Sequence, residues 1–536
     1  MTKRKHFILF LFLLQACFLK AQEIRLVKDI SVVGSSYPAE LTIYHNRLYF
    51  AAYSPDYGRE LWISDGTESG TTLLKDIAPG PNYLALAEFK VFKDKLFFVA
   101  DDGGSGLELW TSDGTAAGTT VFKDIVPGSQ GSQAQSLFVN GDKLFFSARS
   151  NACTTNELWV SDGTVNGTQR IQSALPATEP SNFVALDSTR VIFIANTAAY
   201  GAELWVSDGT AAGTFLLRDI NLTNNGWPSS LYSYNGLIYF SEDDNTHGSE
   251  LWVTDGTTAG TRFVYDVYPG FQPGAPQQFT GLNGYVYFTA LNNDNRSRLW
   301  ATDGTDTGTH IVVDYPSASY NNLAAMQRYQ NKIAFWMDDS LHGYEPWISD
   351  GSDIGTYMIQ DVTPGPGTSF YNFLFIPFDG KLVFPSSTFA GGGLTMFVTE
   401  GVTVEPVNYP YTFYGISETI RPEATLNGAL FFSASFANGY GGELYVLQRN
   451  GVGVKEVNDE EGVSVYPNPV ESSLTVSSKN GSASFTVYDV QGRLVLQQQL
   501  NSAQQSVDVS ALQKGIYVWQ LDNEHGQVCR GRFVRE

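Results

Sequence analysis

The side chains of this chain that could carry chemistry are mainly carboxylates, and they do not fall into a recognised catalytic pattern. Five histidines follow residue 21 and are scattered: His45, His247, His310, His342 and His525. The sequence has no Gly-x-Ser-x-Gly elbow, no His-Glu-x-x-His pair and no phosphate-binding P-loop. We therefore predict no catalytic residues from motif spacing.

Seven aspartates stand out because each precedes a glycine in the same local sequence: Asp65, Asp113, Asp162, Asp208, Asp255, Asp303 and Asp350. A calcium loop needs several oxygen ligands at short alternating spacing, as in Asp-x-Asp-x-Asp-Gly. Each turn here offers one carboxylate and threonine hydroxyls. We interpret the aspartates as turn residues, leave calcium open as an alternative, and predict no other cofactor or metal.

These aspartates belong to a repeat, first seen as Glu-Leu-Trp-Ile-Ser-Asp-Gly-Thr at residues 60–67. Degenerate copies occur around Phe397 and Tyr445, and the nine anchors lie 46–50 residues apart. The tryptophan anchors are Trp62, Trp110, Trp159, Trp205, Trp252, Trp300 and Trp347. Such a regular period indicates a repeat architecture.

Each period contains four short apolar or alternating segments bounded by Asn, Asp, Gly or Pro. In the first complete unit these are residues 39–44, 47–53, 59–64 and 71–77. Four antiparallel strands in about 48 residues are typical of a β-propeller blade. We predict an all-β chain, with a β-propeller of about eight to nine four-stranded blades followed by a small C-terminal β-sandwich.

The repeat motif also predicts how the blades pack. Side chains alternate along a strand, so Leu and Ile of the first copy face one side while Glu, Trp and Ser face the other. Trp opposite Leu and Ile is expected only where both faces are covered by neighbouring sheets. We therefore expect the tryptophans to lie between blades.

The seam of the ring has two readings. Residues 25–30 resemble the fourth strand of a blade without the three strands that should precede it, which suggests that they complete the last blade. Residues 453–458 could instead supply that fourth strand. The sequence thus contains nine anchors but ten candidate fourth strands, so either segment could complete the last blade.

Propeller topology separates a constant face from a variable one. The Asp-Gly turns share one face, while the loops between second and third strands share the opposite face with the connections from blade to blade. We call this second face the connection face. Its sequences vary from blade to blade, which suits a ligand-binding surface, and a solvated acidic rim without a ligand is the alternative interpretation. The candidate ligand residues on this face are Asp101, Asp102, Asp243, Asp244, Trp227 and Tyr320.

The chain ends carry different signals. Residues 1–21 are typical of a signal peptide, with a basic start and an apolar stretch at residues 7–14. Residues 14–17, Leu-Gln-Ala-Cys, offer an alternative lipobox at Cys17. No later stretch has the apolar length of a membrane-spanning helix. The net charge of -22 argues against nucleic-acid binding.

The repeat at residues 22–457 resembles the ELWxxDGT repeat family of secreted Bacteroidota proteins. The resemblance rests on the Glu-Leu-Trp-x-x-Asp-Gly-Thr copies around the tryptophan anchors and weakens in the last two units. It implies a secreted repeat protein and no defined activity.

Residues 458–462 read as a linker, and residues 463–536 resemble the type A C-terminal sorting domain of the type IX secretion system. The residues that carry this resemblance are Tyr466, Pro467, Asn468, Pro469, Gly492, Gly515 and Tyr517. It implies export through the periplasm to the cell surface or medium, recognition by the secretion machinery, and cleavage of the tail, with release or attachment to lipopolysaccharide.

Together these features predict a secreted or cell-surface protein that acts as a non-enzymatic binding or adhesion module for an unidentified protein or carbohydrate. The near-constant period favours this prediction, because no repeat has room for a long catalytic loop. The alternative is an extracellular glycan-active lyase or hydrolase with its active site on the propeller face.

Overall fold

A computed structural model describes residues 22–81, 85–150, 155–223, 225–313, 323–365, 374–387, 394–407, 413–416, 424–436, 439–449, 463–466, 470, 472–478, 483–489, 493–502, 504–523 and 528–535. These residues form strands, turns and bends and contain no helix. Contacts divide the chain into two compact units, Glu23–Gln448 and Arg449–Glu536.

The described strands of the first unit form seven antiparallel sheets: five hold one blade each, and two hold two blades each, joined by single pairings of β12 with β14 and of β32 with β34. We number the resulting blades one to nine. Blades one to three contain β2 (Ala39–Tyr44), β3 (Arg47–Ser54), β4 (Gly58–Ser64), β5 (Thr72–Lys75), β6 (Leu86–Phe92), β7 (Lys95–Asp101), β8 (Leu107–Ser112), β9 (Thr120–Lys123), β10 (Gln135–Asn140), β11 (Lys143–Ala148), β12 (Glu157–Ser161) and β13 (Gln169–Arg170). Blades four to six contain β14 (Thr178–Ala185), β15 (Val191–Thr197), β16 (Gly201–Ser207), β17 (Phe215–Leu216), β18 (Ser229–Tyr234), β19 (Leu237–Asp243), β20 (Ser249–Thr254), β21 (Arg262–Tyr265), β22 (Gln277–Leu282), β23 (Tyr285–Leu291), β24 (Ser297–Thr302) and β25 (His310–Val313).

Blades seven to nine complete the series. They contain β26 (Leu323–Tyr329), β27 (Lys332–Asp338), β28 (Tyr344–Ser349), β29 (Tyr357–Met358), β30 (Ile376–Phe378), β31 (Lys381–Ser387), β32 (Leu394–Thr399), β33 (Val404–Pro406), β34 (Phe413–Ile416), β35 (Ala424–Leu426), β36 (Ala429–Phe436), β37 (Gly441–Arg449) and β1 (Gln22–Lys28). In blade nine both β34 and β35 pair with β36.

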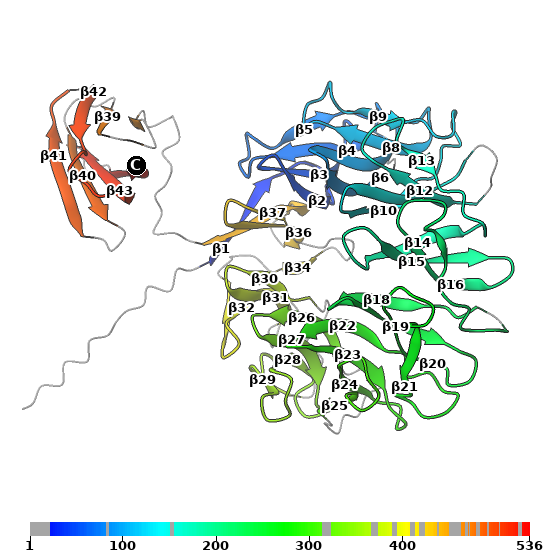
Figure 1. Ribbon diagram of the computed structural model, residues 1–536. Coiled ribbons are helices and arrows are strands. Elements are labelled where there is room, and N and C mark those ends of the chain that lie inside the picture. The colour runs from blue at the N-terminus through cyan, green and yellow to red at the C-terminus, as the bar shows by residue number, and fades with distance from the viewer. Residues whose placement is uncertain are drawn as a thin grey trace, which may run out of the picture. The chain divides into compact units, whose positions relative to one another are not determined.

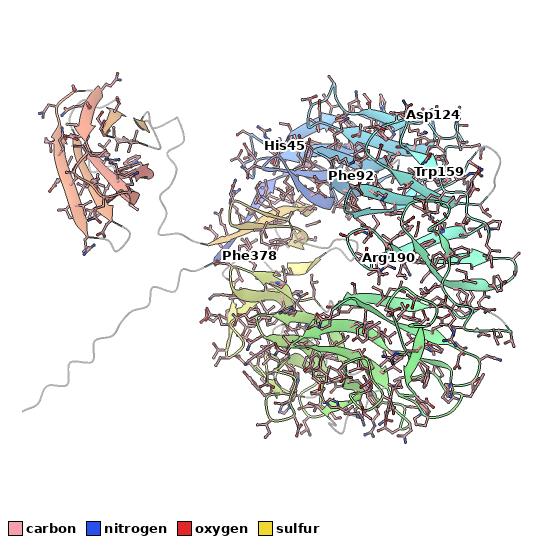
Figure 2. All side chains as sticks on the ribbon, in the orientation of Figure 1. His45, Phe92, Asp124, Trp159, Arg190 and Phe378 are labelled. Carbon is pink, nitrogen blue, oxygen red and sulfur yellow. The ribbon has the colours of Figure 1, made fainter. Side chains whose placement is uncertain are left out.

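The blades are arranged around a common centre (Figure 1). Nine apolar clusters separate them, one for each pair of neighbouring blades, including the pair formed by blades nine and one. Figure 2 labels Phe92 and Trp159 in the cluster between blades two and three, and Phe378 in the cluster between blades eight and nine. The ring is therefore closed, and the predicted β-propeller is confirmed.

The motif tryptophans occupy these interblade clusters. Trp62 packs with β1 and blade nine, while Leu61 and Ile63, its neighbours in β4, pack with blade two. Each blade also sets an aromatic residue of its second strand beside the anchor of its third, as in the stacked pair of Phe288 and Trp300, whose ring centroids are 6.2 Å apart. Such aromatic cross-strand pairs stabilise sheets directly.

The N-terminal strand closes the ring. Strand β1 pairs with β37 and supplies the fourth strand of blade nine. Ile24 of β1 packs against the cluster shared with blade eight, and Val27 packs into the cluster shared with blade one. The alternative fourth strand at residues 453–458 lies outside the described residues.

The second unit is a two-sheet β-sandwich, as predicted. One sheet contains β38 (Val463–Tyr466), β39 (Ser473–Ser478) and β42 (Gln504–Asp508). The other contains β40 (Ala483–Asp489), β41 (Leu494–Leu500), β43 (Gly515–Asn523) and β44 (Val528–Arg535). Their inner faces bury Leu474, Phe485, Trp519 and Phe533 in one core.

Candidate functional site: the connection face at blades four and five

The Asp-Gly-Thr turns are closed by their own hydrogen bonds. In the first copy Asp65 Oδ1 accepts from the backbone N–H of Thr67 at 2.9 Å and from its hydroxyl at 2.7 Å. The Thr67 hydroxyl in turn accepts from the N–H of Gly70 at 2.9 Å. The remaining turns repeat this arrangement around Asp113, Asp162, Asp208, Asp255, Asp303 and Asp350.

These bonds also affect the pKa of Asp113. The side-chain and backbone hydrogen bonds from Thr115 lower the pKa of Asp113, because they favour its ionised form. Among the described residues, no three His, Cys, Asp or Glu side chains converge in a way that could hold a metal ion. The geometry of each turn is that of an Asx turn.

The second glycine of the motif is needed because the aspartate occupies its side-chain space. A β-carbon at Gly70 would lie 2.0 Å from Asp65 Oδ1, and the other six copies have the same clash at 2.0–2.2 Å. Contacts below about 3.0 Å do not occur for real β-carbons. The turn face is thus a rigid scaffold in which the motif letters have structural roles.

We expect Gly260→Ala to lower the free energy of unfolding by about 1–3 kcal/mol, because the new methyl group displaces the Asp255 carboxylate from its turn. Chemical denaturation measures this change. Gly104→Ala is the matched control, since its β-carbon would lie 3.6 Å from the nearest atom and should change stability by less than about 0.5 kcal/mol. Equal effects of the two substitutions would contradict this explanation of the motif.

The motif glutamate anchors the connection to the next blade. Glu60 is 1% exposed and accepts from the backbone N–H groups of Ile77 at 2.7 Å and Ala78 at 2.9 Å. Fourth strand β5 ends at Lys75, two residues before the predicted end, because these amides turn to the carboxylate instead of the strand ladder. Burial raises the pKa of Glu60 to about 7.

The same glutamate recurs in other blades. Glu108 accepts from Ile125, Val126 and Ser132, and Glu250 accepts from Val267 and Gly274. Burial raises the pKa of Glu250 to about 8. Strand alternation predicts that this glutamate faces the same side as the tryptophan, whereas its hydrogen-bond partners are not predicted from the sequence, although the glutamate recurs in the motif.

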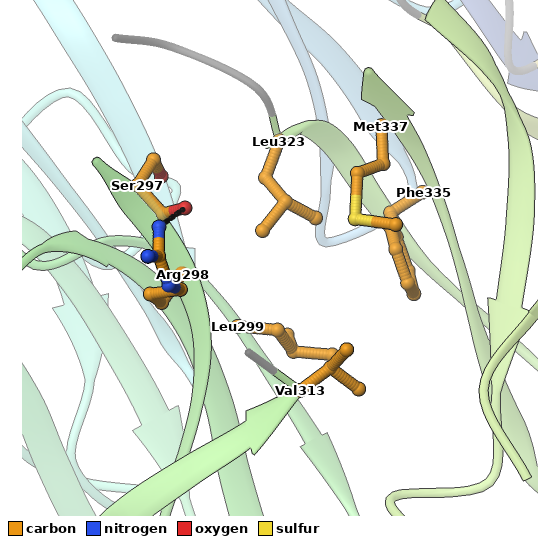
Figure 3. Close-up of a pocket in the computed structure, with 7 residues that line it drawn as sticks. All are labelled: Ser297, Arg298, Leu299, Val313, Leu323, Phe335 and Met337. Atoms are coloured by element: carbon orange, nitrogen blue, oxygen red, sulfur yellow. Dashed lines mark hydrogen bonds between the residues drawn. The ribbon is translucent and has the colours of Figure 1, made fainter. Parts of the chain in front are cut away.

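Blade six departs from this pattern by placing Arg298 at the glutamate position. The Arg298 side chain is 4% exposed, and its Nη2 lies 2.7 Å from Asp294 Oδ2. Figure 3 shows Arg298 beside a small cavity that is also lined by Leu323, Phe335 and Met337. At about 10 Å³ this cavity holds at most one water molecule, so it is a packing defect rather than a ligand site.

The four predicted ligand aspartates close loops on the connection face. Asp102 Oδ1 accepts from the N–H groups of Gly104 and Ser105. Asp244 Oδ1 accepts from the N–H of His247, and its Oδ2 lies 2.8 Å from His247 Nδ1. Asp101 and Asp243 each accept one amide within their own loops.

The structure does not bring these two aspartate pairs together, since Asp101 and Asp102 lie in blade two while Asp243 and Asp244 lie in blade five. Tyr320, the other aromatic candidate, lies outside the described residues. The loop that carries Asp243 does meet Trp227, because the Asp243 N–H donates to the carbonyl of Gly226 at 3.0 Å.

Trp227 occupies a backbone position that recurs from connection to connection. Its φ is +51°, in the left-handed region that bulky residues rarely adopt. Tyr37, Gln133, Glu179 and Ala275 have φ between +45° and +54° at the matching position of other connections. The backbone is thus constant, while the presented side chain differs from one blade to the next.

A polar pocket is lined in part by Asn225, which stands two residues before Trp227 in the chain. The loop between β15 and β16 and the connection from blade four to blade five line an open pocket of about 380 Å³. We use the name Trp227 surface for Trp227, Leu222 and the pocket residues Tyr200, Asp219, Asn221, Thr223 and Asn225. Trp227 is 65% exposed and Leu222 is 81% exposed.

The connection that carries this surface is fixed to blade four. Asn225 Oδ1 accepts from the N–H of Ala202 at 2.9 Å, and Asn221 Nδ2 donates to the carbonyl of Asn225 at 3.3 Å. Of the predicted ligand residues, Trp227, Asp243 and Asp244 therefore share one region. The pocket residues were not predicted, because their spacing in sequence carries no recognisable pattern.

The C-terminal unit matches a known family. Residues 464–534 match the model of the secretion system C-terminal sorting domain. The chain carries a type IX sorting tail. The sorting tail indicates export to the cell surface or the medium. Within it Tyr517 donates to the carbonyl of Gln513 and stacks on Phe533, and Gly515 begins β43. Tyr466 ends β38, while Pro467, Asn468, Pro469 and Gly492 lie outside the described residues.

Comparison with solved structures gives distant likenesses. PorZ, an essential surface component of the type IX secretion system of Porphyromonas gingivalis, is 12% identical over 93% of this chain and 86% of that chain, with a TM-score of 0.33. Oligopeptidase B from Leishmania major is 11% identical over 67% of this chain and 54% of its own, with a TM-score of 0.38. Neither value assigns an activity to this chain.

Comparison with curated proteins gives no match. Within the described part of the chain, no helix is long and apolar enough to cross a membrane.

Proposed function

We propose that this protein is a non-enzymatic binding module of the cell surface or the secreted fraction, and that its propeller binds a carbohydrate through the Trp227 surface. The observation that carries the proposal is one exposed tryptophan, held in a backbone conformation that recurs from connection to connection, two residues after a side chain that lines a polar pocket. An indole ring packs against the apolar face of a sugar, and amides and hydroxyls pair with its hydroxyl groups.

The pocket composition supports a neutral ligand. The polar lining residues Asn221, Thr223, Asn225 and Tyr200 carry no charge, although Asn221 and Asn225 also bond within the connection and to blade four, and Asp219 is the one charged lining residue. A strongly cationic protein partner would be expected to meet more carboxylates. A protein ligand thus remains an outcome of the test and not the proposal.

The proposed setting follows from the ends of the chain. Residues 1–21 would be removed as a signal peptide, and the sorting tail would be recognised by the type IX machinery. Cleavage of the tail would release the ELWxxDGT-type propeller or attach it to lipopolysaccharide. Either outcome would place the connection face in contact with glycans outside the cell.

The alternative of a glycan-active enzyme would need accessible carboxylates at the pocket. Asp219 is the one carboxylate that lines the pocket, and the carboxyl groups of Glu203 and Glu242, which adjoin Gly226, are 0% exposed. General acid catalysis requires the acid to reach the substrate oxygen within hydrogen-bonding distance. This burial favours binding over turnover.

Trp227→Ala is expected to weaken carbohydrate binding about 30-fold, which corresponds to about 2 kcal/mol for a buried aromatic contact. Glycan-array screening of the purified protein identifies the ligand, and calorimetry gives the dissociation constants. The matched control is Ile354→Ala, a 96% exposed apolar residue on the turn face, which should leave binding unchanged.

Three results would count against the proposal: no glycan binding at all, unchanged affinity in the Trp227 variant, or release of reducing sugar from a bound glycan. The last result would establish the enzymatic alternative. Capture of a defined protein ligand with no carbohydrate binding would replace the proposed ligand class.

A further inference from the structure

Blade five carries a buried carboxyl group that the rest of the repeat lacks. The residue of the second strand opposite the motif-glutamate position, which holds Arg298 in blade six, is alanine in six blades: Ala52, Ala100, Ala148, Ala195, Ala290 and Ala434. In blade five this residue is Glu242, opposite Glu250. Glu242 is 0% exposed, so an alanine-sized position has been filled by an acid.

The space for Glu242 comes from Gly226, the residue before Trp227. A β-carbon at Gly226 would lie 2.1 Å from Glu242 Oε1 and 3.0 Å from Glu203 Oε1. At the matching position of other connections, Ser132 Oγ donates to Glu108 at 2.7 Å and Ser36 Oγ donates to Glu443 at 2.5 Å. The Glu242 carboxyl group therefore occupies the place of a serine hydroxyl that donates to the motif glutamate.

The hydrogen bonds of Glu203 to the connection are longer than those of the same glutamate in other blades. Its carboxylate lies 3.4 Å and 3.5 Å from the N–H groups of Ile220 and Asn221, whereas Glu60 and Glu345 hold the matching amides at 2.7–3.1 Å. Among the described residues, no N–H or O–H donor reaches either oxygen of Glu242. The carboxyl group of Glu203 is the neighbour that can share a proton with it, because Glu242 Oε1 and Glu203 Oε1 both lie within 3.0 Å of the β-carbon position at Gly226.

Two carboxyl groups form a hydrogen bond only when one of them keeps its proton. The charged groups that face Glu242 are all acidic: Glu203 from β16, Asp219 from the connection, Asp243 from β19 itself, and Glu250 from β20 with its neighbour Asp266. Burial raises the pKa of Glu242 well above its ordinary value, and the bond to Glu203 raises it further.

We propose that Glu242 is a positioning residue: it shares one proton with Glu203, and this proton holds the connection through Gly226 and Trp227 between blades four and five. The inference rests on the proposed function only in taking the Trp227 surface as the binding surface. The order of the connection itself does not depend on any ligand.

The pH dependence follows from the sign of the shift. The folded protein binds this proton more tightly than the unfolded chain, whose glutamates titrate near 4.5. The stabilisation is therefore complete below pH 4.5 and falls as pH rises toward the folded pKa. Loss of the proton leaves two buried negative charges side by side, and the connection should open locally before the ring unfolds.

Hydrogen exchange of the intact protein between pH 6 and 8.5 tests this inference. After correction for intrinsic exchange rates, we expect protection of the backbone amides of Ile220, Asn221 and Asp243 to fall about tenfold over this range in the native protein. In Glu242→Gln the fall should be less than about threefold, because glutamine keeps a donor for Glu203 and does not titrate.

The double variant Gly226→Ser with Glu242→Ala is the matched control, because it restores the serine and alanine of blade two. It should fold and show no pH-dependent opening of the connection. Glu242→Ala alone should lose protection at all pH values, and Gly226→Ser should rescue it.

An equal loss of protection in the native protein and in Glu242→Gln would overturn the inference. Protection that depends on calcium would also overturn the inference, because the carboxyl pair would then hold a cation instead of a proton. This dependence is tested by comparing exchange in about 1 mM Ca²⁺ with exchange in the presence of a chelator. Neither readout uses a ligand, so failure here is distinguishable from failure of the proposed function, which is judged by carbohydrate binding at pH 6.

Discussion

Replacing Val27 with aspartate should open the propeller ring. Val27 is 2% exposed and packs with Leu48, Phe50 and Trp62 across the boundary between β1 and blade one. A carboxylate placed there has no partner and also removes apolar contacts. We expect a loss of about 4 kcal/mol or more in the free energy of unfolding, measured by chemical denaturation.

Val32→Asp is the matched control. Val32 lies five residues further along the chain but is 78% exposed, so an added carboxylate remains in water and should change stability by less than about 0.5 kcal/mol. If both variants unfolded at the same denaturant concentration, β1 would not close the ring, and the seam would have to be formed by another segment.

The seam could not be decided from sequence because two segments have the pattern of a fourth strand. The residue pattern predicts that a segment forms a fourth strand, but it does not predict the strand with which that segment pairs. The deciding contacts come from Glu443, which accepts from the N–H of Ile30 at 3.1 Å and from Ser36, more than 400 positions away in the chain. The glutamate that anchors each connection thus also anchors the return of the N-terminal segment.

Most of the propeller was predictable from the sequence, because each repeat is defined by contacts between residues that are close together in the chain. Asp, Gly and Thr of the motif contact one another within six residues, so the turn geometry is written in one short segment. The predicted second strand at residues 47–53 is one residue shorter than β3. The fourth strand was predicted too long because Glu60, from a different strand, captures the amides of Ile77 and Ala78.

The candidate site was predictable in part. The connection face follows from strand order alone, and Trp227 was visible as an aromatic residue in a variable connection. Its left-handed backbone and its pocket depend on contacts between segments, which the sequence does not display. Glu242 is different, because a comparison of the repeats shows alanine where blade five has an acid.

The acidic loops of the connection face are also closed by local contacts. Asp101, Asp102, Asp243 and Asp244 form conspicuous pairs in sequence, yet their oxygens accept amides two or three residues away. A carboxylate that closes its own loop has fewer lone pairs to offer a ligand. Exposed aromatic and amide groups are therefore better candidates on this face.

Removal of Val463–Glu536 should abolish surface display. The sorting tail is the part of the chain that matches a secretion signal, and its residues form a compact sandwich with its own core. Without this domain we expect the propeller to be exported across the inner membrane and to accumulate in the periplasm. Fractionation of cells with an antibody against the propeller measures the change.

Two point variants test whether export requires a folded C-terminal domain, without shortening the chain. Trp519 is 6% exposed and stacks on Phe485 with ring centroids 5.8 Å apart, so Trp519→Ala should cost about 3–5 kcal/mol and unfold the small sandwich. Lys514→Ala changes an exposed side chain and should leave export intact. Undiminished surface display of the truncated chain would refute the role of the tail. Normal display of Trp519→Ala would show that an intact sandwich core is not required for recognition by the secretion machinery.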